Sequence, residues 1–431
     1  MQRVFVVDKN REPLMPCHPA RARHLLREGK AAVFRRYPFT IILKEREGGD
    51  VQPVAFKVDP GSRTTGIALV ADCKRGKRIV WAAELTHRGG QIRDALLSRR
   101  QLRRGRRNRK TRYRPARFDN RRKPEGWLPP SLMSRVHNIL TWANRLWRWS
   151  PVCSISMELV RFDTQALENP EISGVEYQQG ELLGYEVREY LLEKWGRKCA
   201  YCGAENVPLE VEHITPKSRG GSNRVSNLTL ACVPCNQRKG NMTAAEFGYP
   251  EIQAKAKRPL KDAAAVNATR WALWRAFDQS DLPLEAGTGG RTKYNRSRQG
   301  YPKTHWLDAA CVGESGEYVY APTSLAPLLI KATGRQSRQM CRMDKYGFPR
   351  TSAKQGRTQF GFQTGDMVRA VVTQGKKQGV YIGRVAVRSS GSFNITTRAG
   401  TVQGIGYRYC TPLHKSDGYS YEEGVSASSP A

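Results

Sequence analysis

Residues 199–241, CAYCGAENVPLEVEHITPKSRGGSNRVSNLTLACVPCNQRKGN, contain two CxxC pairs, Cys199 with Cys202 and Cys232 with Cys235. Four thiolates in two paired knuckles match the tetrahedral coordination that Zn²⁺ prefers. A closed four-cysteine shell leaves no open position for catalysis, so the pattern predicts a structural zinc ion. Such an ion would stabilise the fold of a small module that cannot build a sufficient hydrophobic core of its own.

Between the pairs, Glu212, His213, Asn227 and Asn236 stand in the order and spacing of a ββα-metal finger of the HNH nuclease family, which residues 199–240 resemble. His213, at the predicted end of a strand, suits a general base that activates water, because imidazole titrates near neutral pH. Glu212 and Asn236 offer hard oxygen ligands to one Mg²⁺. Asn227 is expected to orient His213 or to tie the loop together. Glu212 stands where the family usually has aspartate.

The composition of the whole chain indicates a polyanionic partner. Its 431 residues include 73 Lys and Arg against 38 Asp and Glu, a formal net charge of +35. With 39% hydrophobic residues the chain can build real cores, so its length predicts several domains. Nucleic acid is the commonest partner of such a basic protein. The sequence has neither a signal-peptide pattern nor a long apolar run, so we expect an intracellular protein without a membrane partner.

Residues 99–122 concentrate this charge, with twelve arginines and one lysine against a single acid, Asp119. The front of the segment is expected to be helical, with arginines around its whole circumference. Like charges at this spacing repel each other, so the helix needs phosphates on several sides. The alternative is a solvated tail or a localisation signal. The candidate nucleic-acid-binding residues are Arg99, Arg100, Arg103, Arg104, Arg106, Arg107, Arg109, Arg112 and Arg114.

Apolar periodicity outlines the remaining elements. Residues 53–86 form three β-like runs that predict an antiparallel meander. Residues 131–149 have the spacing of an amphipathic helix, and 152–159 that of a buried strand. Residues 1–45 suggest a small β-α-β unit. Beyond residue 355, alternation between Gly-rich turns predicts a small β-barrel-like domain.

A second set of acidic residues is spread along the chain. Asp59 ends a predicted strand, Glu158 lies in a later strand, and Asp308 lies in a helix with His305 three residues before it. Each alone could be a turn former, a solvated strand end or the polar face of a helix. Together they resemble the acidic set of an RNase H-like (RuvC) nuclease, whose carboxylates can hold two Mg²⁺ about 4 Å apart. His305, one helical turn from Asp308, would help to position metal or water.

The order of these motifs, with Pro13-Leu14-Met15-Pro16 near the N-terminus, resembles the IscB family of transposon-encoded, RNA-guided nucleases, regarded as ancestors of the type II CRISPR effector. The resemblance implies a multidomain α/β fold with a RuvC core split in three. The expected segments are an N-terminal PLMP domain (1–50), RuvC part I (51–88), an Arg-rich bridge helix (89–125), RuvC part II (126–197), the HNH domain (198–245), RuvC part III with linkers (246–325) and a C-terminal domain (326–431).

The same resemblance implies a function. An omega RNA would supply guide and scaffold, and the protein would check a short target-adjacent motif in double-stranded DNA. The HNH centre, with one Mg²⁺, would cut the guide-paired strand, and the RuvC centre, with two, the displaced strand. We expect a monomeric protein in a 1:1 complex with RNA, in the prokaryotic cytoplasm and nucleoid-associated when bound to DNA.

The C-terminal segment supports an RNA- and DNA-binding role, since residues 331–431 carry 16 Lys and Arg against five acids. Two other hypotheses remain open. One is an RNA-independent HNH or homing endonuclease, or a junction resolvase, which would leave residues 99–122 without an obvious purpose. The other is a catalytically silent nucleic-acid-binding regulator, which Mg²⁺-dependent cleavage would exclude.

Overall fold

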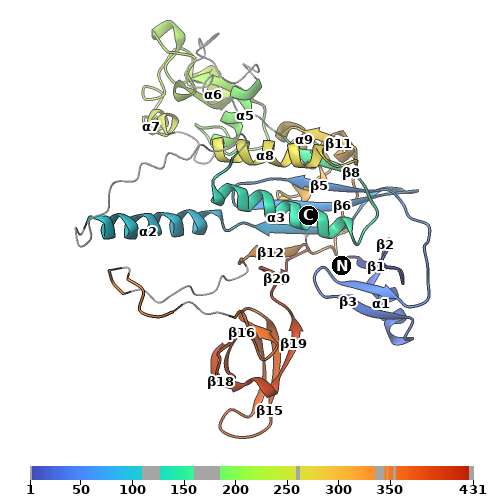
Figure 1. The fold of residues 1–431 in the computed structure, drawn as a ribbon. Helices are drawn as coiled ribbons and strands as arrows, with labels where there is room; N and C mark the ends of the chain where they lie inside the picture. The colour runs from blue at the N-terminus through green and yellow to red at the C-terminus, as the bar shows by residue number, and fades with distance from the viewer. Residues whose placement is uncertain are drawn as a thin grey trace.

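The computed structural model describes residues 2–108, 127–159, 185–258, 263–334, 344–346, 348–352 and 356–426. A central β-sheet carries helices on its faces, and three smaller units surround it (Figure 1). The chain is therefore a multidomain α/β protein, as its sequence predicts. None of the helices in these ranges has both the length and the apolar character needed to cross a bilayer.

The central sheet has seven strands in the order β11-β8-β5-β6-β7-β12-β20. The antiparallel meander predicted from residues 53–86 is present as β5, β6 and β7, and β8, β11 and β12 add to it in parallel. The strands are β5 (Val54–Asp59), β6 (Thr64–Cys73), β7 (Gly76–Thr86), β8 (Val152–Glu158), β11 (Leu284–Gly287), β12 (Leu328–Ala332) and β20 (Tyr419–Glu423).

Helices cover both faces of this sheet, which explains why the middle of β6 is a continuous buried apolar run. On one face lie α3 (Pro130–Trp147) and α8 (Ala263–Asp278), whose side chains share a core with the strands, and Trp142 stacks on Trp81. On the other face α10 (His305–Ala310) packs against β6 and β5. The helix α9 (Gly289–Arg298) lies beside α10.

The cysteine-rich segment is inserted between β8 and β11 and has a separate apolar core. Its hairpin of β9 and β10 is followed by α6, in the ββα order that the sequence predicts. Its elements are α5 (Tyr185–Lys194), β9 (Leu209–His213), the 3₁₀ turns η2 (Lys217–Arg219) and η3 (Val225–Asn227), β10 (Leu228–Cys232), α6 (Val233–Lys239) and α7 (Glu251–Lys257).

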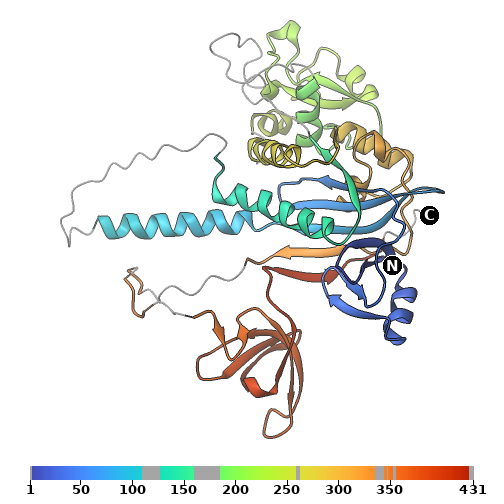
Figure 2. The same ribbon diagram turned by 45° about the vertical axis from the view of Figure 1, so that its right-hand side comes forward.

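The N-terminal unit is a four-stranded sheet in the order β2-β1-β4-β3 with one helix, and it lies beside the central sheet (Figure 2). It contains more strands than the β-α-β unit that the sequence suggests. Its elements are β1 (Val4–Val7), β2 (Pro13–Cys17), α1 (Pro19–Arg27), β3 (Ala31–Arg35) and β4 (Thr40–Leu43).

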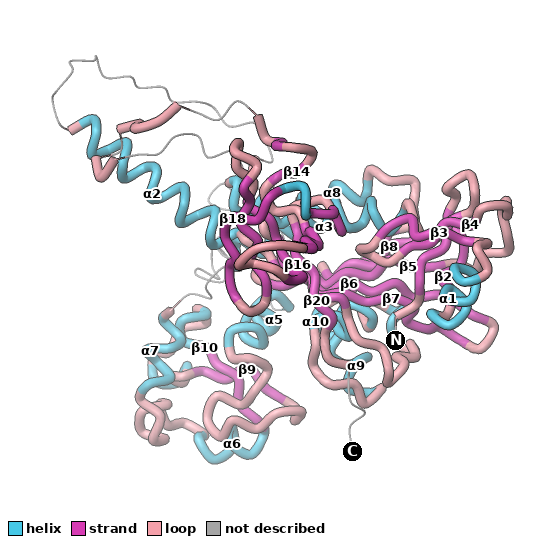
Figure 3. The backbone as a smooth tube through the Cα atoms, turned by 90° about the horizontal axis from the view of Figure 1, so that it is seen from below, coloured by secondary structure: helices cyan, strands magenta, loops and turns pink. Residues whose placement is uncertain are grey.

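Figure 3 shows the C-terminal unit around β16 and β18. This unit contains a five-stranded antiparallel sheet in the order β18-β17-β16-β15-β19. After it the chain returns to the central sheet as β20, which pairs with β12, although both strands fall in the segment predicted as a separate C-terminal domain. The elements of this unit are β13 (Thr358–Gln359), β14 (Phe362–Gln363), β15 (Met367–Val372), β16 (Gly379–Ala386), β17 (Ser392–Thr397), β18 (Gly400–Gly406), the 3₁₀ turn η5 (Tyr407–Tyr409) and β19 (Cys410–His414).

The basic helix α2 (Gly89–Arg107) starts against α3 and projects away from the sheet (Figure 1). Gly89 allows this start, because a Cβ there would lie 2.8 Å from the Ser131 carbonyl oxygen. Beyond Leu97 the helix is almost entirely exposed. The expected distribution of arginines around its circumference is therefore present in the described part of the segment.

Candidate functional sites

The four cysteines of the two CxxC pairs come together in the finger. Cys199 and Cys202 lie after α5, Cys232 ends β10, and Cys235 lies in the first turn of α6. Their sulfur atoms all lie within 4.8 Å of one another. Four convergent thiols are the donor set that suits a tetrahedral zinc ion, so these residues fit the predicted structural zinc.

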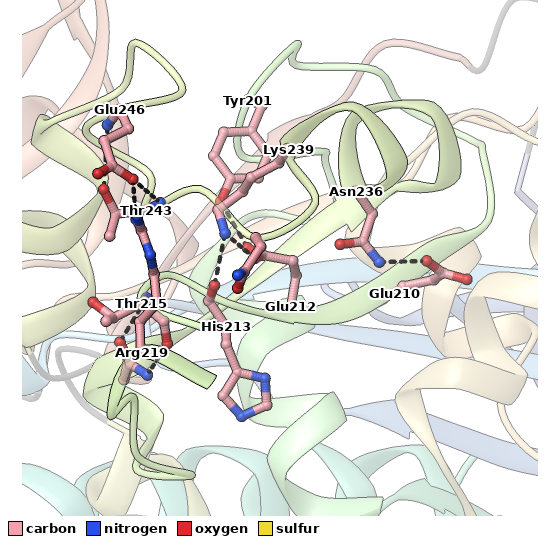
Figure 4. A network of polar contacts seen from close by, with 12 residues as sticks. Tyr201, Glu210, Glu212, His213, Thr215, Arg219, Asn236, Lys239, Thr243 and Glu246 are labelled. Atoms are coloured by element: carbon pink, nitrogen blue, oxygen red, sulfur yellow. Dashed lines mark hydrogen bonds and ion pairs between the residues drawn. The ribbon is translucent and has the colours of Figure 1, made fainter. Parts of the chain in front are cut away.

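Glu212 is directed into the finger (Figure 4). One of its carboxylate oxygens lies 2.5 Å from the Lys239 ammonium, and the other accepts a hydrogen bond of 2.6 Å from the Tyr201 hydroxyl. Lys239 is fully buried and also donates to the His213 carbonyl at 2.9 Å. Burial and the hydrogen bond to Glu212 raise the pKa of Tyr201. This network joins the first CxxC pair, the strand β9 and the helix α6.

Asn236, the other predicted magnesium ligand of the finger, has a different acidic neighbour. Its amide donates to the Glu210 carboxylate at 2.7 Å; Glu210 is exposed and Asn236 is half-buried. Glu210 precedes Glu212 by two positions on β9, so the two carboxylates share one face of the strand. The sequence reasoning did not select Glu210, although this two-residue spacing was a visible signal.

His213 lies at the end of β9, as predicted, with its Nε2 3.0 Å from the Asn223 side-chain oxygen. Asn227 ties the loop together, since its amide donates to the carbonyls of Thr215 and Ser222, and its oxygen accepts from the Thr215 N–H. Of the two expectations for Asn227, the structure therefore supports the loop-tying role.

The structure also gathers the dispersed carboxylates at one end of the central sheet. Asp59 and Glu158 are the last residues of β5 and β8, which are neighbouring parallel strands with Val58 opposite Met157. Asp308 lies on α10, which packs against β5 and β6. Burial and the nearby negative charge of Glu158 raise the pKa of Asp308, and the charge of Arg296 opposes this shift. Three carboxylates from three distant chain segments thus form one acidic centre.

Arginines that the sequence reasoning missed face this acidic centre. From α8, Arg270 lies 2.9 Å from Glu158 and 3.5 Å from Asp59, and it is only 8% exposed. From α9, Arg296 lies 2.7 Å from Asp308. Neither arginine stands out in a chain with 73 basic residues, because nothing in its local sequence identifies the carboxylate that it meets in the fold.

The side chain of His305 is exposed at the first position of α10, one turn before Asp308. Its backbone N–H donates to Glu84 at 3.1 Å. The backbone of α10 approaches β6 so closely that a Cβ on Gly66 would lie 1.8 Å from the His305 carbonyl oxygen. Glycine at position 66 is therefore what allows α10 to present Asp308 to the acidic centre.

A buried polar network continues from the acidic centre along the same face of the sheet. Lys57, two residues before Asp59 on β5, is fully buried and donates to the Val312 carbonyl at 2.8 Å and to the Ser315 hydroxyl. Glu285 on β11 accepts hydrogen bonds from Ser315 and Ser156. Burial lowers the pKa of Lys57 to about 8, although the negative charge of Glu285 opposes the shift.

The predicted nucleic-acid-binding arginines divide into two groups. Arg99, Arg100, Arg103, Arg104 and Arg107 are exposed on α2, and Arg106 is half-buried there. The remaining three, Arg109, Arg112 and Arg114, lie outside the described residues.

Comparisons with known proteins identify the finger. The HNH endonuclease family matches residues 199–250, and a family described as RRXRR protein matches residues 4–180. A comparison with curated proteins finds no match. Residues 199–250 therefore match the HNH endonuclease family, as the residues between the two CxxC pairs predict.

Among solved structures, the crystal structure of Streptococcus thermophilus Cas9 in complex with the AGAA PAM is similar, with 14% identity and a TM-score of 0.20 over 60% of this chain and 32% of that one. The Type II-C Cas9 enzyme from Actinomyces naeslundii has 18% identity and a TM-score of 0.16 over 46% of this chain and 27% of that one. The chain thus spans about a third or less of the length of these structures.

Proposed function

We propose that this protein is an RNA-guided DNA endonuclease of the IscB kind. One observation carries the proposal: an HNH finger is inserted between β8 and β11, two strands of the sheet whose ends hold a separate acidic centre. Two centres for phosphodiester cleavage on one chain suit an enzyme that cuts both strands of a duplex. We assign the seven-stranded sheet to a RuvC-type, RNase H-like core.

In the acidic centre, Asp59, Glu158 and Asp308 would hold two Mg²⁺, since carboxylate oxygens are the ligands that this ion prefers. Bound Mg²⁺ would supply an activated water and charge stabilisation at the scissile phosphate. The parallel pairing of β5 with β8 fixes the first two carboxylates side by side, and α10 adds the third. His305, at the exposed start of α10, is placed to meet substrate from solvent.

In the finger, His213 would take a proton from the attacking water, at its half-exposed position on the end of β9. Asn236 would hold one Mg²⁺ together with Glu212 or with Glu210. Glu212 would first have to leave Lys239, whereas Glu210 already lies beside Asn236. Replacing each glutamate by glutamine, and measuring the Mn²⁺ affinity of the finger, separates these two ligand sets.

The proposed RNA partner is an omega RNA that supplies guide and scaffold. The exposed arginines of α2 support it, because a helix with charge around its circumference can contact several phosphate backbones at once. The basic C-terminal unit would bind RNA and the target-adjacent motif in double-stranded DNA. By the IscB resemblance, the finger cuts the guide-paired strand and the acidic centre the displaced one. A prokaryotic cytoplasmic 1:1 complex of one chain with one RNA belongs to the same proposal.

The test is to purify the protein from cells that contain its native locus, sequence any co-purifying RNA, and assay cleavage of a matched duplex labelled on both strands. We expect a long specific RNA, Mg²⁺-dependent double-strand cleavage, and single-strand nicking by Asp59→Ala and by His213→Ala, each on a different strand. RNA-free protein that cuts a fixed DNA sequence would instead establish a homing endonuclease or a resolvase. Specific nucleic-acid binding without cleavage would establish a silent regulator.

A further inference from the structure

Arg270 is placed between two carboxylates of the acidic centre. It lies on the sheet-facing side of α8, and its Nη2 is 2.9 Å from Glu158 Oε1 and 3.5 Å from Asp59 Oδ1. Its Nε donates to the Pro60 carbonyl at 3.1 Å, just after β5 ends. A single guanidinium nitrogen therefore spans the ends of two neighbouring parallel strands.

The charges explain why a cation is needed at this position. Asp59, Glu158 and Asp308 converge in a largely buried place, and carboxylates this close repel one another unless positive charge separates them. Arg270 supplies that charge to Asp59 and Glu158, while Arg296 supplies it to Asp308. A divalent cation held by Asp59 and Glu158 would draw on the same two carboxylates that Arg270 now contacts.

Resting on the proposed function, we propose that Arg270 is a tethered counter-cation that competes with the divalent metal for Asp59 and Glu158. It holds the two carboxylates in place before metal binds, and its Nη2 has to move away when metal binds. Arg270 is thus a positioning residue that sets the metal concentration at which the acidic centre becomes occupied. The hydrogen bond to Pro60 keeps the displaced guanidinium nearby.

A direct measurement is the binding of Mn²⁺ to the purified full-length protein, followed by electron paramagnetic resonance. We expect Arg270→Gln to tighten Mn²⁺ binding at the acidic centre by about tenfold, the order of effect that one charge-assisted hydrogen bond produces. The matched control is Arg275→Gln, an exposed arginine on the same helix, which should leave the affinity unchanged. Unchanged or weaker Mn²⁺ binding by Arg270→Gln would overturn the proposal.

Thermal unfolding provides a second readout. Arg270→Gln should lower the Tm in buffer without Mg²⁺ or Mn²⁺, because Asp59 and Glu158 then repel each other, and saturating Mn²⁺ should restore the Tm to the value of the Mn²⁺-loaded wild type. If Arg270→Gln lowers the Tm equally with and without Mn²⁺, Arg270 forms an ordinary structural ion pair, and the proposed competition between Arg270 and the metal is overturned.

Asp59→Asn separates failure of this inference from failure of the proposed function. If Asp59→Asn leaves the Mn²⁺ stoichiometry and affinity of the protein unchanged, the acidic centre is not a metal site and the proposed function of that centre fails. If Asp59→Asn removes Mn²⁺ binding while Arg270→Gln has no effect, only the role of Arg270 is refuted. A slower displaced-strand cut by Arg270→Gln with unaltered Mn²⁺ affinity would mark Arg270 as a substrate-contacting cation instead.

Discussion

At the scale of single residues, buried cations lie beside the carboxylates of both the acidic centre and the HNH finger. Lys57 and Lys239 are fully buried, and Arg270 and Arg296 are nearly so. A buried charge is tolerated only when it is paired and hydrogen-bonded, and each of these groups has an acidic partner near a proposed catalytic residue. The large excess of positive charge in this chain therefore includes a small internal fraction that no polyanion can reach.

Lys239 provides a test at this scale. Lys239→Met leaves Glu212 buried without its cation, which should destabilise the finger by about 3–5 kcal/mol. Urea-dependent release of zinc to a chromogenic chelator reports unfolding of the finger within the full-length protein. Lys217→Met, at an exposed position on the same finger, is the control. The double variant Lys239→Met, Glu212→Gln should recover part of the loss. Equal urea midpoints for Lys239→Met and Lys217→Met would contradict the ion-pair argument.

Lys57 predicts a pH dependence of stability. Its pKa is lowered from the ordinary 10.5 to about 8, chiefly by burial. Between these values the unfolded chain binds a proton that the folded chain lacks, so this position adds stability as pH rises, by about 1.4 kcal/mol per unit. The Tm of wild type should therefore rise relative to that of Lys57→Met between pH 8 and 10.5, while the exposed Lys74→Met follows wild type. If the Tm of wild type and that of Lys57→Met change in parallel over this pH range, the predicted stabilisation through Lys57 is refuted.

At the scale of elements, the acidic centre depends on how closely α10 approaches β6. Gly66→Ala would place a Cβ 1.8 Å from the His305 carbonyl oxygen, so α10 and its Asp308 have to shift. A displacement of about 1 Å at a catalytic group can cost about 100-fold in rate. We expect nicking of the displaced strand to fall by that factor while the finger still cuts the guide-paired strand.

The control for this variant is Gly90→Ala, because a Cβ on Gly90 has no atom within 4 Å. A duplex labelled differently on its two strands measures both cuts in one reaction. Equal loss of both cuts by Gly66→Ala would indicate general unfolding, and an unchanged displaced-strand cut would mean that α10 does not position Asp308 for catalysis.

At the scale of the whole molecule, the exposed face of α2 predicts how RNA binding depends on salt. Arg99, Arg103 and Arg107 are exposed and can each neutralise a phosphate. Replacing all three by glutamine should reduce the slope of log K against log salt by about 0.7–0.9 for each phosphate that is no longer neutralised. RNA affinity measured over a range of KCl concentrations tests this. Arg93→Gln is the control, since Arg93 pairs with Asp94. An equal change of slope in the triple variant and in Arg93→Gln would contradict the assignment of the phosphate contacts to the outer part of α2.

Much of this architecture could be predicted from the sequence, because it depends on local residue spacing and apolar periodicity. The CxxC spacing predicted the four-cysteine cluster, and the motif between the pairs predicted the HNH domain. The three runs of residues 53–86 became the meander β5-β6-β7. Periodicity did not predict that Tyr419–Glu423 would rejoin the central sheet, because the pairing of β20 with β12 joins segments far apart in sequence.

The sequence by itself determined the ligand types, the four-cysteine cluster and the concentration of charge in α2, because each depends on residue identity and short-range spacing. Only the tertiary structure decided which groups meet. It paired Glu212 with Lys239 rather than with Asn236, and it placed Arg270 between Asp59 and Glu158. The physical reason is that desolvation and ion pairing act through space, so the partner of a buried charge is selected by packing and not by its neighbours in the chain.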